Sequence, residues 1–211
     1  MTMQETDMDA RMSVLHASPG APTLDIYFDG CLAIEGLPYG ALSELVVMPA
    51  DRHRLDVFAA GVRRPEAVLL DSDLALLKPG WEYTLAIVGE PDQMQATLLG
   101  DTTPVPGVGR AWVRVLHASP DAPAVDVGIA SGPVLFRQVA FTQTTPFVEV
   151  ATGPVDLEMR RAGHTEVVAR LAGYPLSGDN RYTFVAAGYL DREPGFTVMS
   201  LAEPVRRCEP V

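Results

Sequence analysis

A twelve-residue segment occurs twice in this chain, and it constrains the fold more than any other feature. Residues 14–25 and 115–126 agree at nine of twelve positions, 101 residues apart, including the run Val-Leu-His-Ala-Ser-Pro. The end of each copy also recurs, because residues 77–84 align with 176–183 and Gly89 aligns with Gly188. The sequence therefore predicts two complete units, residues 12–101 and 112–205, joined by a Pro/Gly-rich linker at 101–109.

Hydrophobic residues within each unit alternate with polar ones, which is the pattern of a half-buried β-strand. The alternating residues include Leu24, Ile26 and Phe28 in the first unit and Val125, Val127 and Ile129 in the second. Turn-forming pairs such as Asp29-Gly30 and Pro79-Gly80 separate these segments. Short strands at regular spacing predict an all-β fold of two tandem immunoglobulin-like antiparallel β-sandwich modules.

Each unit also carries a leucine followed six residues later by a tyrosine, Leu77 with Tyr83 and Leu176 with Tyr182. This spacing resembles the tyrosine corner of immunoglobulin-like folds, in which a tyrosine at the start of a late strand bonds to nearby backbone. We therefore expect both tyrosine hydroxyls to hydrogen-bond to backbone a few residues upstream.

The charge balance excludes one class of partner. The chain has 27 acidic and 16 basic residues, a formal net charge of −11, whereas a nucleic-acid-binding protein needs a basic footprint. No hydrophobic run approaches the roughly 18–20 residues of a membrane span. Residues 1–11 are polar and acidic and lack the apolar core of a signal peptide. We therefore expect no nucleic acid, no membrane insertion and no export signal.

The chain has two cysteines, Cys31 and Cys208, far apart in the sequence. Without a Cys-x-x-Cys pair, a cysteine zinc site and a thioredoxin-like motif are excluded. Two free thiols are the favoured interpretation, and a single disulfide is the alternative. No cofactor is predicted.

The repeated segment places a histidine and an aspartate in each unit, His16 with Asp25 and His117 with Asp126. Such a pair can act as an acid–base couple or as half of a metal site. Strand parity argues against both roles, because His16 shares the apolar face while Asp25 takes the polar face. We predict a buried, hydrogen-bonded histidine and an aspartate that bonds turn backbone.

Ser18 and Ser119 precede prolines, which fits a turn, and no Gly-x-Ser-x-Gly elbow surrounds either serine. We therefore predict no catalytic residue and no metal site. His53, which lies between two arginines, is expected in an exposed loop. Asp71-Ser72-Asp73 lacks the further ligands of a calcium loop, so a solvated turn is expected there.

The two units differ in their aromatic residues. Tyr27 aligns with Gly128, and Trp81 aligns with Asn180. Parity places Tyr27 outward, so the first unit is expected to expose aromatic surface that the second lacks. Tyr27 and Trp81 are therefore predicted contacts for a partner. The alternative is that they cover the junction with the second unit.

The motif His-Ala-Ser-Pro-x-Ala-Pro-x-x-Asp, with a later Tyr-Thr strand, resembles the family DUF4397, a domain of unknown function. Residues 14–30 and 115–130 carry the motif. The family is associated with bacterial and archaeal β-sandwich proteins, mostly exported or surface-attached and without assigned chemistry. The resemblance therefore implies a non-enzymatic binding or structural module of the cell surface or envelope, with an unknown protein or glycan partner.

Two other functions stay open from the sequence. One is a hydrolase acting on envelope polymers, which needs paired carboxylates on one face that parity does not supply. The other is a metal or small-ligand sensor that uses the duplicated histidines, His16 and His117.

Overall fold

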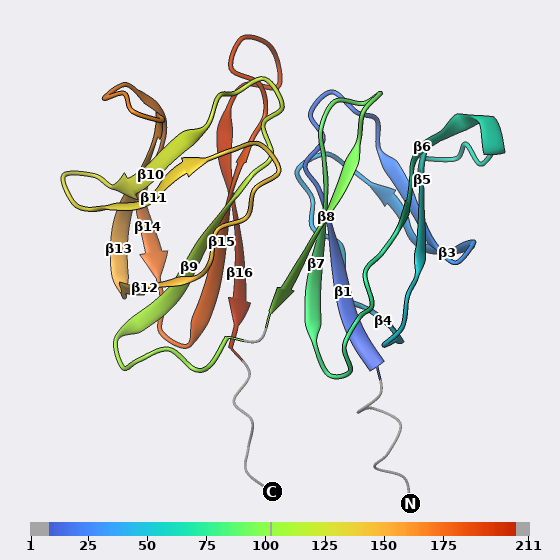
Figure 1. Cartoon of the computed structure of the whole chain (residues 1–211), viewed down its shortest axis with the longest axis horizontal. Helices are drawn as coiled ribbons and strands as arrows, with labels where there is room; N and C mark the ends of the chain where they lie inside the picture. The colour runs from blue at the N-terminus through green and yellow to red at the C-terminus, as the bar shows by residue number, and fades with distance from the viewer. Residues whose placement is uncertain (1–8, 102, 206–211) are drawn as a thin grey trace, which may run out of the picture. The chain divides into compact units, whose positions relative to one another are not determined.

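The computed structural model of the chain describes residues 9–101 and 103–205. These residues form sixteen β-strands, and their one helical element is a single 3-10 turn. The chain divides into two compact units, residues 1–102 (unit 1) and 103–211 (unit 2). Each of the four sheets takes all its strands from one unit (Figure 1).

Unit 1 consists of two four-stranded sheets. The first has the order β4-β1-β7-β8, and the second has the order β3-β2-β5-β6. Strands of the first sheet are β1 (Asp9–His16), β4 (Val46–Pro49), β7 (Glu82–Val88) and β8 (Gln95–Asp101). Strands of the second sheet are β2 (Leu24–Phe28), β3 (Cys31–Leu37), β5 (Arg54–Ala59) and β6 (Val68–Asp73).

Unit 2 repeats this arrangement strand for strand. Its sheets have the orders β12-β9-β15-β16 and β11-β10-β13-β14. The first sheet contains β9 (Arg110–His117), β12 (Val148–Ala151), β15 (Asn180–Ala187) and β16 (Thr197–Pro204). The second contains β10 (Val125–Ile129), β11 (Val134–Val139), β13 (Gly153–Arg161) and β14 (Val167–Leu176).

The predicted all-β fold of two sandwich modules is confirmed, with one refinement in each unit. All named strand pairs are antiparallel except β1 with β7 and β9 with β15, which are parallel. Parallel neighbours need a long crossover connection, and here the whole second sheet of each unit lies between the two strands in sequence.

The core of unit 1 lies between its two sheets and follows the alternation seen in the sequence. Met12 and Val14 from β1 and Leu24 and Ile26 from β2 are fully buried members of one hydrophobic cluster. Unit 2 has a separate hydrophobic cluster of its own, which includes the fully buried Phe184. Each unit therefore buries enough apolar area to have an independent core.

Both predicted tyrosine corners are present. The backbone N–H of Lys78 donates to the Tyr83 hydroxyl at 2.9 Å, and that of Ser177 donates to the Tyr182 hydroxyl at 2.8 Å. The tyrosine at the start of β7 or β15 thus joins its strand to the turn that precedes it.

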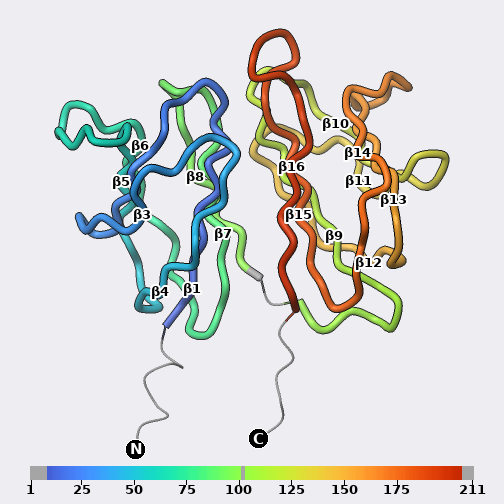
Figure 2. Tube along the Cα trace, turned by 180° about the vertical axis from the view of Figure 1, so that it is seen from behind, coloured from blue at the N-terminus to red at the C-terminus, as the bar shows by residue number. Residues whose placement is uncertain are grey.

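The connection between β5 and β6 projects from unit 1 in both views (Figures 1 and 2). It contains the 3-10 turn η1 (Pro65–Ala67). The strand β6 follows it and includes Asp71-Ser72-Asp73, so the expected solvated turn at these residues is wrong. Pairing with β5 holds this segment extended despite its polar composition.

Cys31, the first residue of the edge strand β3, is exposed and carries a free thiol. Cys208 lies outside the described residues, so its predicted free state stays a prediction.

Candidate functional site

The two motif histidines occupy equivalent buried positions. His16 and His117 are both 0% exposed, and the Nε2 atom of each lies 3.0–3.1 Å from a carbonyl oxygen, of Pro22 and Pro123 respectively. Because a carbonyl only accepts, Nε2 carries the proton in each ring. Burial lowers the pKa of both imidazoles and outweighs the opposing effect of the carbonyl, so both are neutral near pH 7.

The motif serines are also buried, and their hydroxyls have other partners. The Ser18 hydroxyl donates to the Gly89 carbonyl at 2.6 Å, and the Ser119 hydroxyl donates to an Asp121 carboxylate at 3.3 Å. The Nδ1 atom of His16 accepts the backbone N–H of Ser18 at 3.4 Å, not its hydroxyl. The structure brings Ser18 beside His16 without the hydroxyl-to-imidazole bond of an activated serine.

The motif aspartates, Asp25 and Asp126, bind backbone. Each carboxylate accepts two backbone N–H groups, one from the neighbouring edge strand and one from a turn, at 2.8–3.2 Å. The donors are Gly36 and Gly61 for Asp25, and Gln138 and Gly163 for Asp126. The hydrogen bonds of the motif thus run from its histidine and its aspartate to separate backbone groups, in both units alike.

The expectation that Tyr27 is exposed is wrong. Parity places it on the outer face of its sheet, but the side chain is only 7% exposed. The Phe58 ring packs edge-on against it, and the Arg63 guanidinium lies 4.3 Å from its ring centre. A hydrogen bond of 2.7 Å to the Gly30 carbonyl holds Arg63 there. The loop after β5 therefore covers the tyrosine. Its role as a partner contact stays a prediction.

Trp81 is partly buried by residues of its own unit. Its ring stacks on Tyr83 with the ring centres 6.0 Å apart, and the Lys78 ammonium lies 4.2 Å from its centre. Both neighbours belong to the tyrosine corner, so Trp81 packs around that turn. Its role as a partner contact stays a prediction.

The expectation that His53 lies in an exposed loop is also wrong. The residue is 7% exposed, and both ring nitrogens meet acceptors: Nδ1 lies 2.6 Å from an Asp29 carboxylate oxygen and Nε2 lies 2.8 Å from the Pro49 carbonyl. Two acceptors require two N–H groups, so this ring is an imidazolium. Burial lowers the pKa of His53, but the bonds to Pro49 and Asp29 and the charges of Asp29 and Asp51 together raise it above the ordinary value.

A groove of about 370 Å³ lies on the outer face of the β3-β2-β5-β6 sheet of unit 1. We call it the β5–β6 groove. Its lining residues are Arg54, Asp56, Phe58, Arg63, Pro65, Val68 and Asp71. Arg54, Asp56 and Phe58 share the outer face because they alternate along β5 with two core residues.

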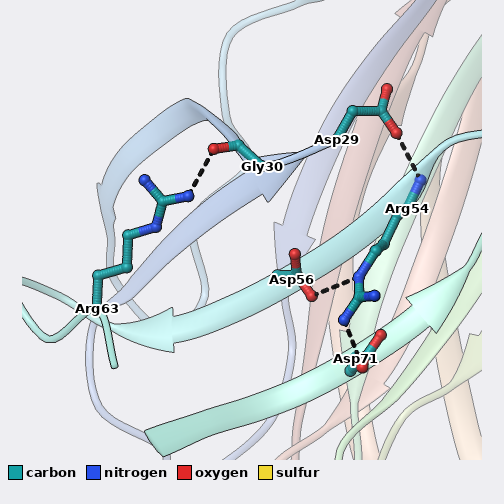
Figure 3. A network of polar contacts seen from close by, with 6 residues as sticks. All are labelled: Asp29, Gly30, Arg54, Asp56, Arg63 and Asp71. Carbon is teal, nitrogen blue, oxygen red and sulfur yellow. Dashed lines mark hydrogen bonds and ion pairs between the residues drawn. The ribbon is translucent and has the colours of Figure 1, made fainter. Parts of the chain in front are cut away.

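Arg54 is the centre of the polar side of this groove (Figure 3). Its Nε donates to Asp56 at 3.1 Å, and its Nη2 donates to Asp71 at 2.8 Å. The side chains of Arg54 and Asp71 are 57% and 51% exposed, and that of Asp56 is 18% exposed. The backbone N–H of Arg54 donates to Asp29, the partner of His53, which fixes the start of β5.

The equivalent face of unit 2 has a different set of side chains. Strand register places Glu158 where unit 1 has Asp56, because they pair with Gly128 and Tyr27 respectively. The Glu158 side chain is 8% exposed, and its two carboxylate oxygens accept from Arg160 and Arg170. Here arginines lie over a buried glutamate, whereas in unit 1 an arginine lies open between two aspartates.

The surroundings of Gly128 explain why unit 2 has no aromatic side chain at the position of Tyr27. A Cβ at this position would meet the Pro133 carbonyl oxygen at 2.9 Å and the Val134 Cα at 3.0 Å. The neighbouring strand β11 approaches the backbone of β10 too closely for a side chain. The two outer faces therefore differ in shape as well as in charge.

Sequence reasoning missed the groove and His53. A signal for the groove was present in Arg54, Asp56 and Phe58, which alternate with apolar residues at strand spacing. They lie next to Asp71 because β5 pairs with β6. The connection between these two strands has no periodic sequence pattern from which the pairing could be predicted.

Two further properties hold for the described residues. No helix within residues 9–101 and 103–205 is long and apolar enough to cross a membrane. Over the same ranges, no cluster of three or more His, Cys, Asp or Glu side chains is arranged to hold a metal ion.

The fold and the duplicated motif define a protein of tandem β-sandwich units. The chain belongs to the family described as "Domain of unknown function (DUF4397)", whose model matches residues 10–128 and 111–206. None of the curated proteins matches the chain.

Among solved structures, one similar chain is that of "CBMbc (family CBM26) from Eubacterium rectale Amy13K in Complex with Maltoheptaose". The match covers 95% of this chain and 99% of that chain, with 8% sequence identity and a TM-score of 0.27. A likeness of this size has no bearing on what the present chain binds.

Proposed function

We propose that this chain is a non-catalytic binding protein in which the family motif holds each sandwich together and unit 1 takes the ligand in the β5–β6 groove. The observation that carries the proposal is the difference between two faces that occupy equivalent positions in the fold. In unit 1 Arg54 and Asp71 are half exposed around a groove, while in unit 2 two arginines bind a buried Glu158. Concave sites with a few convergent polar groups are the usual places for ligands.

The state of the motif residues supports the non-catalytic part of the proposal. A sensor or an acid–base site needs an imidazole nitrogen that is accessible to its target, and His16 and His117 are fully buried with Nε2 bonded to backbone. The same bonds occur in both units, as expected for groups that stabilise a shared fold.

The groove does contain two carboxylates on one face, which a hydrolase requires. In a glycoside hydrolase one of the two carboxyl groups must hold a proton. Arg54 donates to both Asp56 and Asp71, an arrangement that suits two carboxylates acting as acceptors. We therefore favour binding over hydrolysis at this site.

A mixed array of glycans and peptides, probed with the full chain, tests the location of the site. The double variant Asp56→Asn, Asp71→Asn keeps the size of both side chains but removes the ion pairs with Arg54. We expect it to lower the affinity for any ligand identified on the array by at least about tenfold, which corresponds to about 1.4 kcal/mol of binding free energy.

Glu158→Gln is the matched control, because it removes a carboxylate at the equivalent position of unit 2. It should leave the affinity within about twofold, a change below 0.5 kcal/mol or so. Circular dichroism of each variant checks that the fold is retained. Equal losses in the two folded variants, or no loss in either, would show that the groove is not the site.

A further inference from the structure

The formal charges of the groove residues cancel. Its lining includes two arginines, Arg54 and Arg63, and two aspartates, Asp56 and Asp71. The neighbouring pair of His53 and Asp29 also sums to zero when both are charged. A site without net charge gives no long-range preference to an anionic or a cationic ligand.

The remaining hydrogen-bonding capacity of the groove is mixed in the same way. Arg54 uses Nε and Nη2 on the two aspartates, and each aspartate uses one oxygen for Arg54. Among the described residues this leaves Nη1 of Arg54 as a donor and one carboxylate oxygen each on Asp56 and Asp71 as acceptors. A hydroxyl group both donates and accepts, so the hydroxyls of a ligand can bond to donors and acceptors of this kind.

The rest of the lining is apolar. Phe58, Pro65 and Val68 form this part, and Val68 is 37% exposed. A ligand that fits therefore carries a hydrophobic C–H surface on one side and hydroxyls on the other. The volume of about 370 Å³ is within the range of small-ligand sites and suits a segment of a longer chain.

From these features we infer that the β5–β6 groove binds a neutral polyhydroxylated ligand, the sugar rings of an uncharged oligosaccharide. This inference rests on the proposed function and adds the chemical class of the ligand. Arg54 and its two aspartates already pair with one another. A charged ligand group could pair with one of these side chains only by displacing its present partner, which would leave that partner's charge unmatched. A neutral sugar keeps these ion pairs and adds hydrogen bonds to them.

The experiment compares hexasaccharides that differ in charge. Chitohexaose and cellohexaose are neutral, the chitosan hexamer is the cationic counterpart of the first, and a hyaluronan hexasaccharide is anionic. Each is titrated into the isotopically labelled full chain, and shifts of the Arg54 Nε–H and of the backbone amides of β5 and β6 report binding in the groove. We expect a neutral probe to bind at least about tenfold more tightly than the charged ones.

Two variants test the physical basis. Arg54→Lys keeps the charge but loses the planar set of donors, so it should lower the affinity for the neutral probe by about tenfold. Asp71→Asn removes a charged acceptor and leaves the groove with a net positive charge. It should therefore weaken binding of the neutral probe severalfold and strengthen binding of the hyaluronan probe. Glu158→Gln again serves as the control.

The outcomes separate the two proposals. Groove shifts with a charged hexasaccharide or an arrayed peptide, and none with a neutral sugar, would overturn the ligand class while leaving the site in place. If the neutral probes bind but the groove variants have no effect, both the site and the ligand class are wrong. If neither neutral hexasaccharide shifts the groove signals at millimolar concentration, the ligand class is wrong.

Discussion

The histidines of this chain differ in charge because their hydrogen-bond partners differ. His16 bonds one carbonyl and accepts one backbone N–H, which suits a neutral ring. His53 meets a carboxylate and a carbonyl, which requires two ring protons. Burial lowers the pKa of His16, whereas the acceptors around His53 outweigh burial and raise its pKa.

The charge of His53 predicts a pH-dependent contribution to stability. Since the folded pKa lies above the ordinary value of 6.5, the contribution is complete below about pH 6.5 and is lost as the pH rises through the folded pKa. At pH 6, His53→Gln should lower the free energy of unfolding by about 1 kcal/mol, because the pair with the half-exposed Asp29 is partly screened by water. Urea unfolding from pH 5.5 to 9 measures the difference between the two proteins.

The difference in free energy of unfolding between the wild type and His53→Gln should become smaller toward alkaline pH. The pKa values of His16 and His117 are lowered, so their contributions to stability decrease as the pH falls below 6.5. These contributions are the same in both proteins and cancel in the comparison. Asp29→Asn should show the same loss of pH dependence. A constant difference between wild type and His53→Gln across this range would mean that His53 is not charged in the folded state.

Single side chains join strands and turns that are distant in sequence. Asp25 on β2 bonds both Gly36 on β3 and Gly61 after β5, and Asp126 repeats this in unit 2. The backbone of Gly36 has a positive φ of 65°, a conformation that a glycine adopts without strain. The motif aspartate thus stabilises an irregular strand on one side and a turn on the other.

The tyrosine corners predict a specific loss of stability. Tyr83→Phe removes the hydroxyl that accepts the Lys78 N–H and should lower the free energy of unfolding by about 1–2 kcal/mol. Tyr182→Phe should act likewise in unit 2, because Ser177 donates to it in the same way.

Tyr174→Phe is the control for these variants, since the Tyr174 hydroxyl makes no hydrogen bond with the described residues while its ring packs against Tyr182. Thermal or urea unfolding of the three variants measures the effect. The corner would have no stabilising role if Tyr83→Phe and Tyr174→Phe proved equally mild.

At the scale of the molecule, residues 9–101 and 103–205 form two sandwiches with separate cores, and no sheet among them is shared. The linker expected at residues 101–109 includes residues that bond to strands of unit 2. Trp112 donates to the Pro104 carbonyl at 2.7 Å, and the Gly107 N–H donates to Glu149 at 2.9 Å. Pro104 and Gly107 therefore belong to the compact unit 2.

We expect residues 1–102 and 103–211 to fold as separate fragments, because each retains both of its sheets and its hydrophobic cluster. Circular dichroism should show β-structure in each fragment, and heating should produce a cooperative transition in each. A fragment of residues 1–60, which lacks β6, β7 and β8, is the negative control. A half that stays unfolded alone would show that the units depend on one another.

Much of the fold could be predicted from the sequence, because its signals are local. Alternation at a period of two follows from the geometry of a strand and identifies which residues share a face. The Leu77–Tyr83 spacing places a hydroxyl near a turn five residues away, which one hydrogen bond then joins. The repeat doubled each of these signals and predicted two units of the same design.

Tertiary structure alone decided which of those faces is covered and which is open. Parity placed Tyr27 outward, but Arg63 lies over it because the loop after β5 returns to Gly30. The sequence determined the composition of β5 and β6, while their pairing brought Arg54 between Asp56 and Asp71. Contacts between segments far apart in the chain depend on the path of the loops, and no short-range pattern encodes that path.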